Sequence, residues 1–316
     1  MKGRYFGNQA TGAGLKKGVE YFEQAIDKDP GYALAYAGLA DSYSALGGDW
    51  LYLPPGDSIR KAKAASKKAL ELDDTLAEAH AALAYATFFD WDWPNAEREF
   101  KRAIELNPSS AISHEHYAEF LRTRLRFNES MAEAQRAQEL DPLSPDIVAG
   151  VGFVYLYTQQ HDESIAQFQK ALELNPNATV LRVGLSWAYA VKGMYPEALG
   201  EYDKIPDQDK AVAAGNQFVA SGRGWVYAVS GRRADGLKIA QQFRDLSSRS
   251  YVDSYFLAGI YAGLGDRDEA FRLLENGYNE HSAQMPYLGI DVFWDGMHSD
   301  PRYADLLRRM GLPQPQ

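Results

Sequence analysis

Residues 103–142 read AIELNPSSAISHEHYAEFLRTRLRFNESMAEAQRAQELDP. Pro108 and Pro142 each follow a leucine and an Asn or Asp, and they are 34 residues apart. The same ending returns 34 residues later at Pro176, and one period earlier the slot reads Leu72-Asp73-Asp74. Proline cannot donate to a helix hydrogen-bond ladder and disfavours the α conformation of the residue before it, so each ending closes a helix. The period therefore predicts an array of repeated helical units rather than one globular core.

Small side chains recur at fixed positions within these units. When the proline is position 32, small residues fall at positions 8, 20 and 27, and larger apolar residues at positions 7, 11 and 24. The small residues are Ala84, Ala96 and Ala103 in the unit starting at Ala77, Gly152, Ser164 and Ala171 in the unit starting at Pro145, and Ser186 and Ala198 in the unit starting at Thr179. Two helices cross closely only where side chains are small, and large side chains fill the space beside them. The pattern therefore predicts two crossing helices in every unit.

With this length and register, the sequence resembles the tetratricopeptide-repeat (TPR) family over residues 15–279. The resemblance implies an all-α fold, a right-handed superhelical α-solenoid of helix-turn-helix repeats. We expect a linker at 1–14, then a half repeat and about seven repeats at 15–279 with an insertion at 47–56, and a C-terminal extension at 280–316. Within that extension, Asp300 and Gly311 bracket a predicted helix that covers the last apolar face of the array.

A narrower resemblance comes from the two ends of the sequence. The opening Arg4-Tyr5-Phe6 with Leu15-Lys16-Lys17-Gly18, and the closing Ser299-Asp300-Pro301-Arg302-Tyr303, resemble the limits of C-terminal TPR modules in bacterial signalling and transcriptional regulators. In such proteins a winged-helix DNA-binding domain, a serine/threonine kinase or a nucleotide cyclase precedes the repeats. This sequence contains none of these domains, so their activities are not assigned to it. The resemblance implies a fragment of a longer regulator, with an attached or separate effector domain as a partner.

Composition excludes several classes of function. Hydrophobic residues make up 46% and aromatic residues 13% of the chain, which is typical of a folded protein. The net charge of −10 repels phosphate backbones and argues against direct nucleic-acid binding. No run approaches the roughly 18 apolar residues that a spanning helix needs, so we predict no membrane insertion by this chain. We predict a cytoplasmic location, or an extracytoplasmic one if a membrane anchor lies upstream.

The family resemblance implies partner binding on the concave surface, which the first helix of each repeat lines, chiefly through positions 2, 5, 9, 12 and 13. The predicted partner-binding residues of this surface are Tyr85, Phe88, Phe89, Glu115, His116, Glu119, Arg122, Phe153, Tyr157, Trp187, Phe218 and Trp225. Aromatic side chains recur among them. Two interpretations stay open: the aromatic residues are buried by superhelical packing, or they form a groove for an extended or helical peptide.

The histidines are candidates for metal ligands or for acid–base groups. His80 and His114 both fall at position 4, which is a packing position in the family. His116 and Glu119 have the spacing of neighbours on one helix face, which indicates a polar cluster or a partner contact. No second pair of this kind accompanies them, as a carboxylate-bridged dimetal site would require. We therefore predict no catalytic residue, no metal site and no cofactor.

Three functions remain in competition. The first is a protein–protein interaction module that binds a peptide or protein partner in its concave groove, as the sensory or scaffolding part of a bacterial regulator. The second is a small-molecule receptor, in which Trp187, Trp225 and Phe153 wall an apolar pocket. The third is an enzyme on a helical-repeat frame, which would need acid, base or metal groups gathered in one cavity. We predict the first and expect that the chain is not an enzyme.

Overall fold

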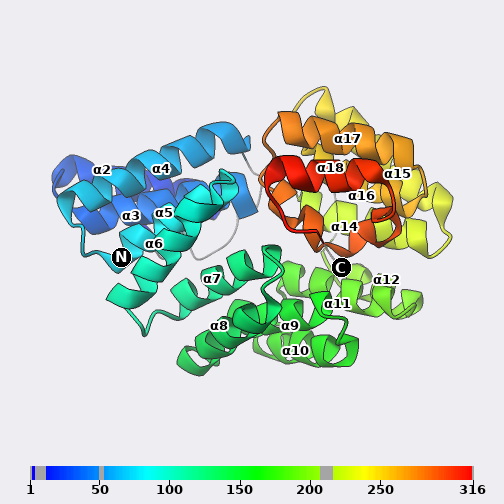
Figure 1. Ribbon diagram of the computed structural model, residues 1–316, viewed down its shortest axis with the longest axis horizontal. Coiled ribbons are helices and arrows are strands. Elements are labelled where there is room, and N and C mark those ends of the chain that lie inside the picture. The colour runs from blue at the N-terminus through cyan, green and yellow to red at the C-terminus, as the bar shows by residue number, and fades with distance from the viewer. Residues whose placement is uncertain (1, 4–11, 50–52, 207–215, 315–316) are drawn as a thin grey trace. The chain divides into compact units, whose positions relative to one another are not determined.

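The computed structural model describes residues 2–3, 12–49, 53–206 and 216–314 (Figure 1). The predicted opening at Arg4-Tyr5-Phe6 and part of the predicted insertion, residues 50–52, lie outside the described residues. The chain divides into two compact units, unit 1 (Met1–Tyr117) and unit 2 (Ala118–Gln316). The division falls within the helix α7 (Ala111–Thr123).

The secondary structure of the described residues is helical. It comprises sixteen α-helices, three short 3-10 or π segments and, within those ranges, no strand. The α-helices pack as consecutive pairs, first helix against second helix, along the chain. The predicted all-α class and the α-solenoid of helix pairs are therefore confirmed.

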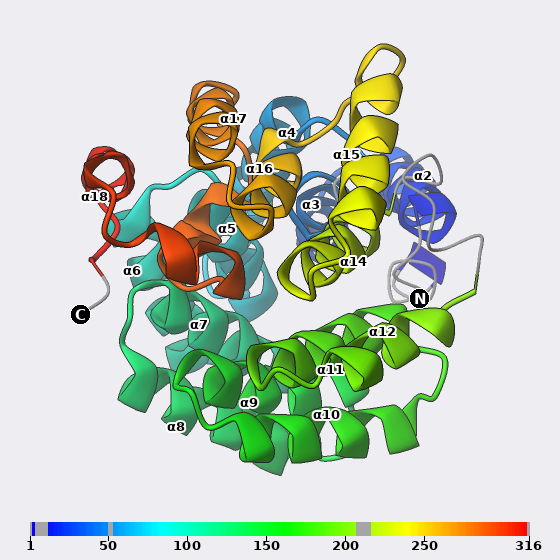
Figure 2. The same ribbon diagram turned by 90° about the vertical axis from the view of Figure 1, so that its right-hand side faces the viewer.

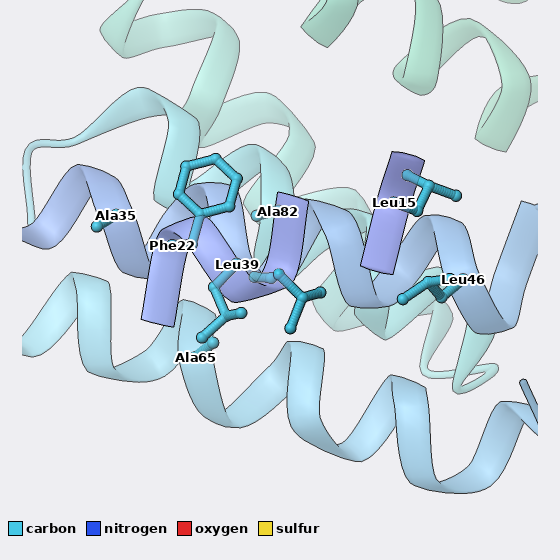
Figure 3. Close-up of a cluster of buried hydrophobic side chains, with 9 residues drawn as sticks. Leu15, Phe22, Ala35, Leu39, Leu46, Ala65 and Ala82 are labelled. Carbon is cyan, nitrogen blue, oxygen red and sulfur yellow. The ribbon is translucent and has the colours of Figure 1, made fainter. Parts of the chain in front are cut away.

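Unit 1 begins with a single helix and continues with helix pairs (Figure 1). Its helices are α2 (Gly12–Lys28), α3 (Ala33–Ser44), α4 (Pro55–Leu72), α5 (Ala77–Phe89), α6 (Trp93–Leu106) and the first half of α7, with a π-helical turn η1 (Ala45–Asp49) after α3. Helix α2 begins three residues before Leu15, where the repeat pattern starts in the sequence. Figure 3 shows Leu15 and Phe22 of α2 gathered with Leu39 and Ala65 in the core of this unit.

Unit 2 continues the pairs and ends in non-repeat structure. Its paired helices are α8 (Phe127–Leu140), α9 (Pro145–Tyr157), α10 (His161–Leu174), α11 (Thr179–Val191), α12 (Tyr195–Asp203), α14 (Gln217–Val229), α15 (Arg233–Ser247), α16 (Ser254–Gly263) and α17 (Arg267–Asn279). Two 3-10 helices, η3 (Met285–Gly289) and η4 (Val292–Met297), and the last helix α18 (Pro301–Met310) follow. Figure 2 shows α9 to α12 side by side in chain order, followed by α14 to α17.

The ends of the second helices follow the proline pattern. Asn107, Asp141 and Asn175 each cap a helix with φ near −139° and an extended ψ of 79° to 88°. This is the conformation that a following proline imposes on its predecessor. Each of the three also donates its backbone N–H to a carbonyl one turn back, on Ala103, Ala137 and Ala171.

The small residues lie where the paired helices cross, as the sequence predicts. Ala84, Ala96, Ala103 and Ala171 are fully buried. Three serines at these positions also form hydrogen bonds across the crossing. Ser130 Oγ donates to the carbonyl oxygen of Ala118 at 2.7 Å, Ser164 Oγ to Gly152 at 2.9 Å and Ser186 Oγ to Ala198 at 2.9 Å. A serine can replace alanine here because its hydroxyl finds a buried acceptor within the repeat.

The side chain at position 4 of the repeat joins three parts of the structure. It lies on the first helix and contacts the second helix of the same pair and the turn that precedes the first helix. His80 Nδ1 lies 2.6 Å from Glu99 Oε2, and its Nε2 lies 3.0 Å from the carbonyl oxygen of Asp74. Arg182 repeats the arrangement with Glu201 at 2.8 Å and the Pro176 carbonyl. His114 Nε2 contacts the corresponding Pro108 carbonyl at 3.1 Å. These contacts are structural, which supports the packing interpretation of both histidines.

The C-terminal helix α18 packs on α17 and has the predicted bounds. The Asp300 side chain accepts a hydrogen bond from the backbone N–H of Arg302 at 3.0 Å and caps the helix. Gly311 ends it in the left-handed region with φ of 66°, where glycine is favoured. Arg309 forms a bidentate ion pair with Glu275 of α17, at 2.7 and 2.9 Å. Helix α18 thus covers α17, as a terminal cap of a repeat array should.

Candidate functional site

The candidate site is the inner face of unit 2, which we define as the surface lined by the first helices of its pairs: residues 118–123 of α7 and the helices α9, α11, α14 and α16. Seven of the predicted partner-binding residues belong to it: Glu119, Arg122, Phe153, Tyr157, Trp187, Phe218 and Trp225. A non-repeat segment of the same chain, residues 282–297 with η3 and η4, lies against this face. We call it the inner segment.

An aromatic cluster joins the inner segment to α11 and α14. The ring of Phe293 lies 5.1 Å from that of Trp187 and 5.4 Å from that of Trp225, and Phe218 meets Trp187 edge-on at 5.1 Å. Edge-to-face geometry at these separations is favourable beyond simple burial. The exposed fractions of Trp187, Trp225 and Phe293 are 2%, 5% and 3%. Trp187 and Trp225 are therefore covered by a segment of the protein itself, whereas Phe153, Tyr157 and Phe218 are partly exposed.

Glycine on α16 makes room for the aromatic cluster. A Cβ atom at Gly259 would lie 2.8 Å from Phe293 Cδ2, and one at Gly263 would lie 2.9 Å from Trp225 Cδ1. Contacts this short do not occur for real side chains, so a larger residue at either position would displace a ring. The two glycines thus shape the face to the inner segment.

Beside the aromatic cluster, Asp291 is held by two tyrosine hydroxyls. Tyr157 of α9 donates to its Oδ1 at 2.9 Å, and Tyr255 of α16 donates to its Oδ2 at 2.7 Å. Trp294 Nε1 in turn donates to the Tyr255 hydroxyl at 2.9 Å. Asp291 is only 7% exposed, and burial raises its pKa to about 6, against the hydrogen bonds and the positive charge of Arg122, which lower the pKa. Burial and the Asp291 charge also raise the pKa of both tyrosines.

Arg122 supplies the positive charge of the site. Its guanidinium lies 5.4 Å from the ring centre of Phe153 and 5.7 Å from that of Tyr157, within the range of cation–π attraction. Its Nη2 is 3.4 Å from Glu119 Oε1, which also accepts a hydrogen bond of 2.6 Å from the Tyr287 hydroxyl of the inner segment. Buried Arg122 and Asp291 and the partly buried Glu119 form a charge network in which the arginine offsets two acids.

The ends of the inner segment are also attached. Ser282 Oγ donates to the buried Asp253 at 2.6 Å, and Arg267 donates to the carbonyl oxygen of Gly296 at 2.8 Å. In the middle, the Tyr303 hydroxyl of α18 donates to the carbonyl oxygen of Leu288 at 2.6 Å. The inner segment is therefore held to unit 2 along its whole length.

The other predicted residues lie in unit 1 and pack among themselves. Tyr85 stacks on His116 with ring centres 4.0 Å apart and meets Phe89 edge-on at 4.9 Å. Phe88 and Phe89 are fully buried. Glu115 Oε2 lies 3.7 Å from His116 Nε2. The structure thus gives His116 and Glu119 different partners: His116 stacks on an aromatic ring, whereas Glu119 pairs with Arg122.

Neither a metal centre nor a membrane span is found in the part of the chain that the structure describes. No three His, Asp or Glu side chains of the described residues converge in a way that could hold a metal ion. Likewise, none of the described helices is both long and apolar enough to span a bilayer.

The repeat pattern does not identify the residues that the inner segment contributes. Residues 280–298 only interrupt this pattern, which therefore gives no position to Asp291, Phe293 or Trp294. A signal was present for Tyr255, which falls at position 5 of the last repeat, one of the inner positions. An acid followed at once by three apolar residues, Val292-Phe293-Trp294, after the last repeat was the other signal.

Two parts of the chain match models of a known protein family. Two tetratricopeptide-repeat family models match residues 92–145 and 155–221. Over these two ranges the chain is similar to tetratricopeptide repeats. No curated protein matches its sequence. The TPR assignment of these residues agrees with the period and the small-residue register described above.

Solved structures with similar folds cover most of the chain. The human IFIT1 dimer with m7Gppp-AAAA is 16% identical, with a TM-score of 0.62 over 85% of this chain and 68% of that one. Cut9 in the APC/C hetero-tetramer Cut9-Hcn1 is 14% identical, with a TM-score of 0.58 over 77% and 47%. PilW, a type IV pilus biogenesis factor, is 21% identical, with a TM-score of 0.51 over 67% and 95%. At these identities the likeness is one of fold alone.

Proposed function

We propose that this chain is an interaction module that binds a peptide or protein partner on the inner face of unit 2, as the sensory or scaffolding part of a bacterial regulator. The observation that carries the proposal is that this face already holds a peptide segment, the inner segment, through side-chain contacts to α7, α9, α11, α14 and α16. A surface that accommodates an aromatic anchor and a hydrogen-bonded acid has the features of a peptide-recognition site.

Other observations support an interaction role. Helical-repeat arrays present long surfaces built from neighbouring repeats, which suit extended partners. Among the fold relatives, Cut9 forms a complex with another protein, Hcn1. The net charge of −10 favours basic or amphiphilic partners over nucleic acid. The proposal includes a non-catalytic, cytoplasmic module and an effector domain, attached or separate, that responds to binding.

The small-molecule alternative receives less support from the geometry. An apolar pocket between Trp187 and Trp225 would need open space there, but the ring of Phe293 packs against both indoles. The enzyme alternative would need converging acid, base and electrophilic groups. The acids Asp291 and Glu119 instead accept hydrogen bonds from tyrosines of the fold.

The test uses the inner segment as the probe. We expect a synthetic peptide of residues 282–297 to bind the full chain carrying Phe293→Ala, in which the aromatic anchor of the inner segment is removed. Fluorescence anisotropy of the labelled peptide measures the affinity, and a melting curve shows that the variant is folded. The matched control is Phe243→Ala, which removes a buried phenylalanine of α15 outside the inner face. A folded Phe293→Ala chain that does not bind the peptide would contradict the proposed function.

A further inference from the structure

We propose that the inner face selects a partner segment with a carboxylate two residues before an aromatic side chain, and that the inner segment competes with this partner for the face. The proposal rests on the proposed function and adds the chemistry of the partner and its regulation. It follows from two subsites of fixed separation, one for an acid and one for an aromatic ring, and from the way in which the inner segment is anchored.

The acid subsite presents donors and a cation. The hydroxyls of Tyr157 and Tyr255 both point at the carboxylate of Asp291, one to each oxygen. Arg122 adds a positive charge that lowers the pKa of this carboxyl. An apolar residue in place of Asp291 would leave two buried hydroxyl donors without an acceptor, and a lysine would also meet Arg122. The subsite therefore favours a carboxyl group, whose two oxygens accept one hydrogen bond each, over apolar or basic side chains.

The aromatic subsite is occupied by Phe293, two residues after Asp291. Phe293 enters between Trp187 and Trp225, and the absence of a side chain at Gly259 leaves space for its ring. The flat Phe293 ring meets Trp187 edge-on and Trp225 at a tilt, whereas a branched aliphatic side chain offers no such edge or face. Asp291 is extended, Val292 starts a 3-10 helix, and Phe293 is two residues after Asp291. This backbone conformation and this spacing place the carboxylate and the ring in their two subsites. A partner would need the same spacing.

The inner segment is attached in a manner that allows exchange. Its regular structure consists of the 3-10 helices η3 and η4, and the side chains of Asp291 and Phe293 contact α9, α11, α14 and α16. Its two ends continue into α17 and α18, which are fastened to each other by Arg309 with Glu275 and by Arg302 with Asp268. In the proposed exchange the segment leaves the inner face as a loop, which also breaks the hydrogen bond from Tyr303 of α18 to the Leu288 carbonyl, while the two ion pairs keep α18 on α17. Since both ends remain tethered, it competes at a high effective concentration.

Competition of this kind lowers the apparent affinity for a partner. When only a fraction of the molecules has an open face, the apparent dissociation constant is the intrinsic one divided by that fraction. Weakening the inner segment raises the open fraction and tightens partner binding. In the wild-type chain the inner segment then covers the inner face in most molecules. Loss of the Phe293 ring increases the fraction of molecules in which this face is open.

The experiment measures a set of peptides against two chains. The peptides are residues 282–297 in the natural sequence and with Asp291→Asn, Phe293→Ala or Asp295→Asn, the last being a matched control because Asp295 is exposed. The chains are wild type and Phe293→Ala, with Phe243→Ala as the stability control. We expect the natural peptide to bind Phe293→Ala at least about tenfold tighter than wild type or Phe243→Ala. On Phe293→Ala, peptides with Asp291→Asn or Phe293→Ala should lose at least about fivefold in affinity, and Asp295→Asn should lose nothing.

The outcomes separate this inference from the proposed function. If all four peptides bind the Phe293→Ala chain alike, or if wild type binds as tightly as Phe293→Ala, the inference is overturned while peptide binding stands. If no peptide binds a folded Phe293→Ala chain, the proposed function itself fails. If Phe293→Ala and Phe243→Ala raise the affinity for the natural peptide equally, the cause is a general destabilisation of unit 2. That result would also overturn the proposed competition.

Discussion

Asp291 places an ionisable group in the interior of unit 2, between the hydroxyls of Tyr157 and Tyr255. Burial raises its pKa from 3.8 to about 6 in the folded chain. Between these two values the folded chain therefore holds a proton that the unfolded chain has released. The contribution of this group to stability is fully present below the unfolded pKa and is lost as the pH rises through the folded pKa.

This difference predicts a pH effect that a single substitution removes. The free energy of unfolding of wild type minus that of Asp291→Asn should fall by about 2 kcal/mol between pH 4 and pH 6, because one pKa unit corresponds to about 1.4 kcal/mol. Denaturant titrations of both chains over this range measure it. Burial also raises the pKa of Asp253 and Glu280, but both residues are present in the two chains and cancel in the difference. If the free energies of unfolding of wild type and Asp291→Asn change with pH in parallel, Asp291 is not buried as described.

The repeat pattern predicts some residues well and others not at all. Ala103 and Ala171 were predicted at helix crossings because the requirement for a small side chain recurs with the repeat, and both are fully buried. Asp291 could not be placed, because its partners Tyr157 and Tyr255 are 134 and 36 residues away and no period relates them. The prediction that the inner aromatic residues bind a partner cannot be decided from spacing, since packing and recognition need the same side chains.

At the level of the helix pair, the turn between the two helices has one recurring conformation. Trp91, Leu125 and Gln159, which are 34 residues apart in sequence, have φ values of 60°, 58° and 61°. The next turn has Gly193 at the same position with φ of 76°, and Gly231 and Gly265 continue the series. The turn therefore requires the left-handed region, which costs a residue other than glycine about 1 to 2 kcal/mol.

An exchange of residues between two of these turns tests this requirement. We expect Gln159→Gly to stabilise the chain by about 0.5 to 1 kcal/mol, because the relief of backbone strain exceeds the greater entropy that glycine loses on folding. Gly193→Gln should destabilise it by a similar amount, although a Cβ atom there would meet nothing within 4 Å. Thermal or denaturant unfolding of the two variants provides the measurement. If both substitutions have the same sign, backbone conformation is not what limits these turns.

Helices were predictable as elements, whereas the inner segment was not. The ends at Asn107 and Asn175 depend on a local rule, the effect of proline on the residue before it, and they could be read from the sequence. The turns η3 and η4 contain too few residues to show a helical period, and their conformation depends on distant contacts such as Tyr303 with the Leu288 carbonyl. Their tertiary contacts, and not a local propensity, determine where they lie.

Across the molecule, the largest helix contacts join the two helices of one repeat or helices of neighbouring repeats, which is typical of a solenoid. In such arrays stability is a sum of terms for single repeats and for adjacent pairs, and distant repeats unfold independently unless something connects them. The inner segment is such a connection within unit 2. Tyr287 contacts Glu119 across 168 residues, and Asp291 joins Tyr157 of α9 to Tyr255 of α16.

We expect the inner segment to make unit 2 unfold as one cooperative body, and Phe293→Ala to uncouple its two ends. Native-state hydrogen exchange reports the free energy of opening for each helix. In wild type, amides of α9 and α16 should exchange with the same opening free energy. In Phe293→Ala, which removes the ring between Trp187 and Trp225, the two values should differ by about 1 kcal/mol or more. Phe243→Ala removes a buried ring of α15 but leaves the inner segment unchanged. It should therefore lower both opening free energies by the same amount. Different opening energies for α9 and α16 in wild type would mean that neighbouring repeats alone hold unit 2 together.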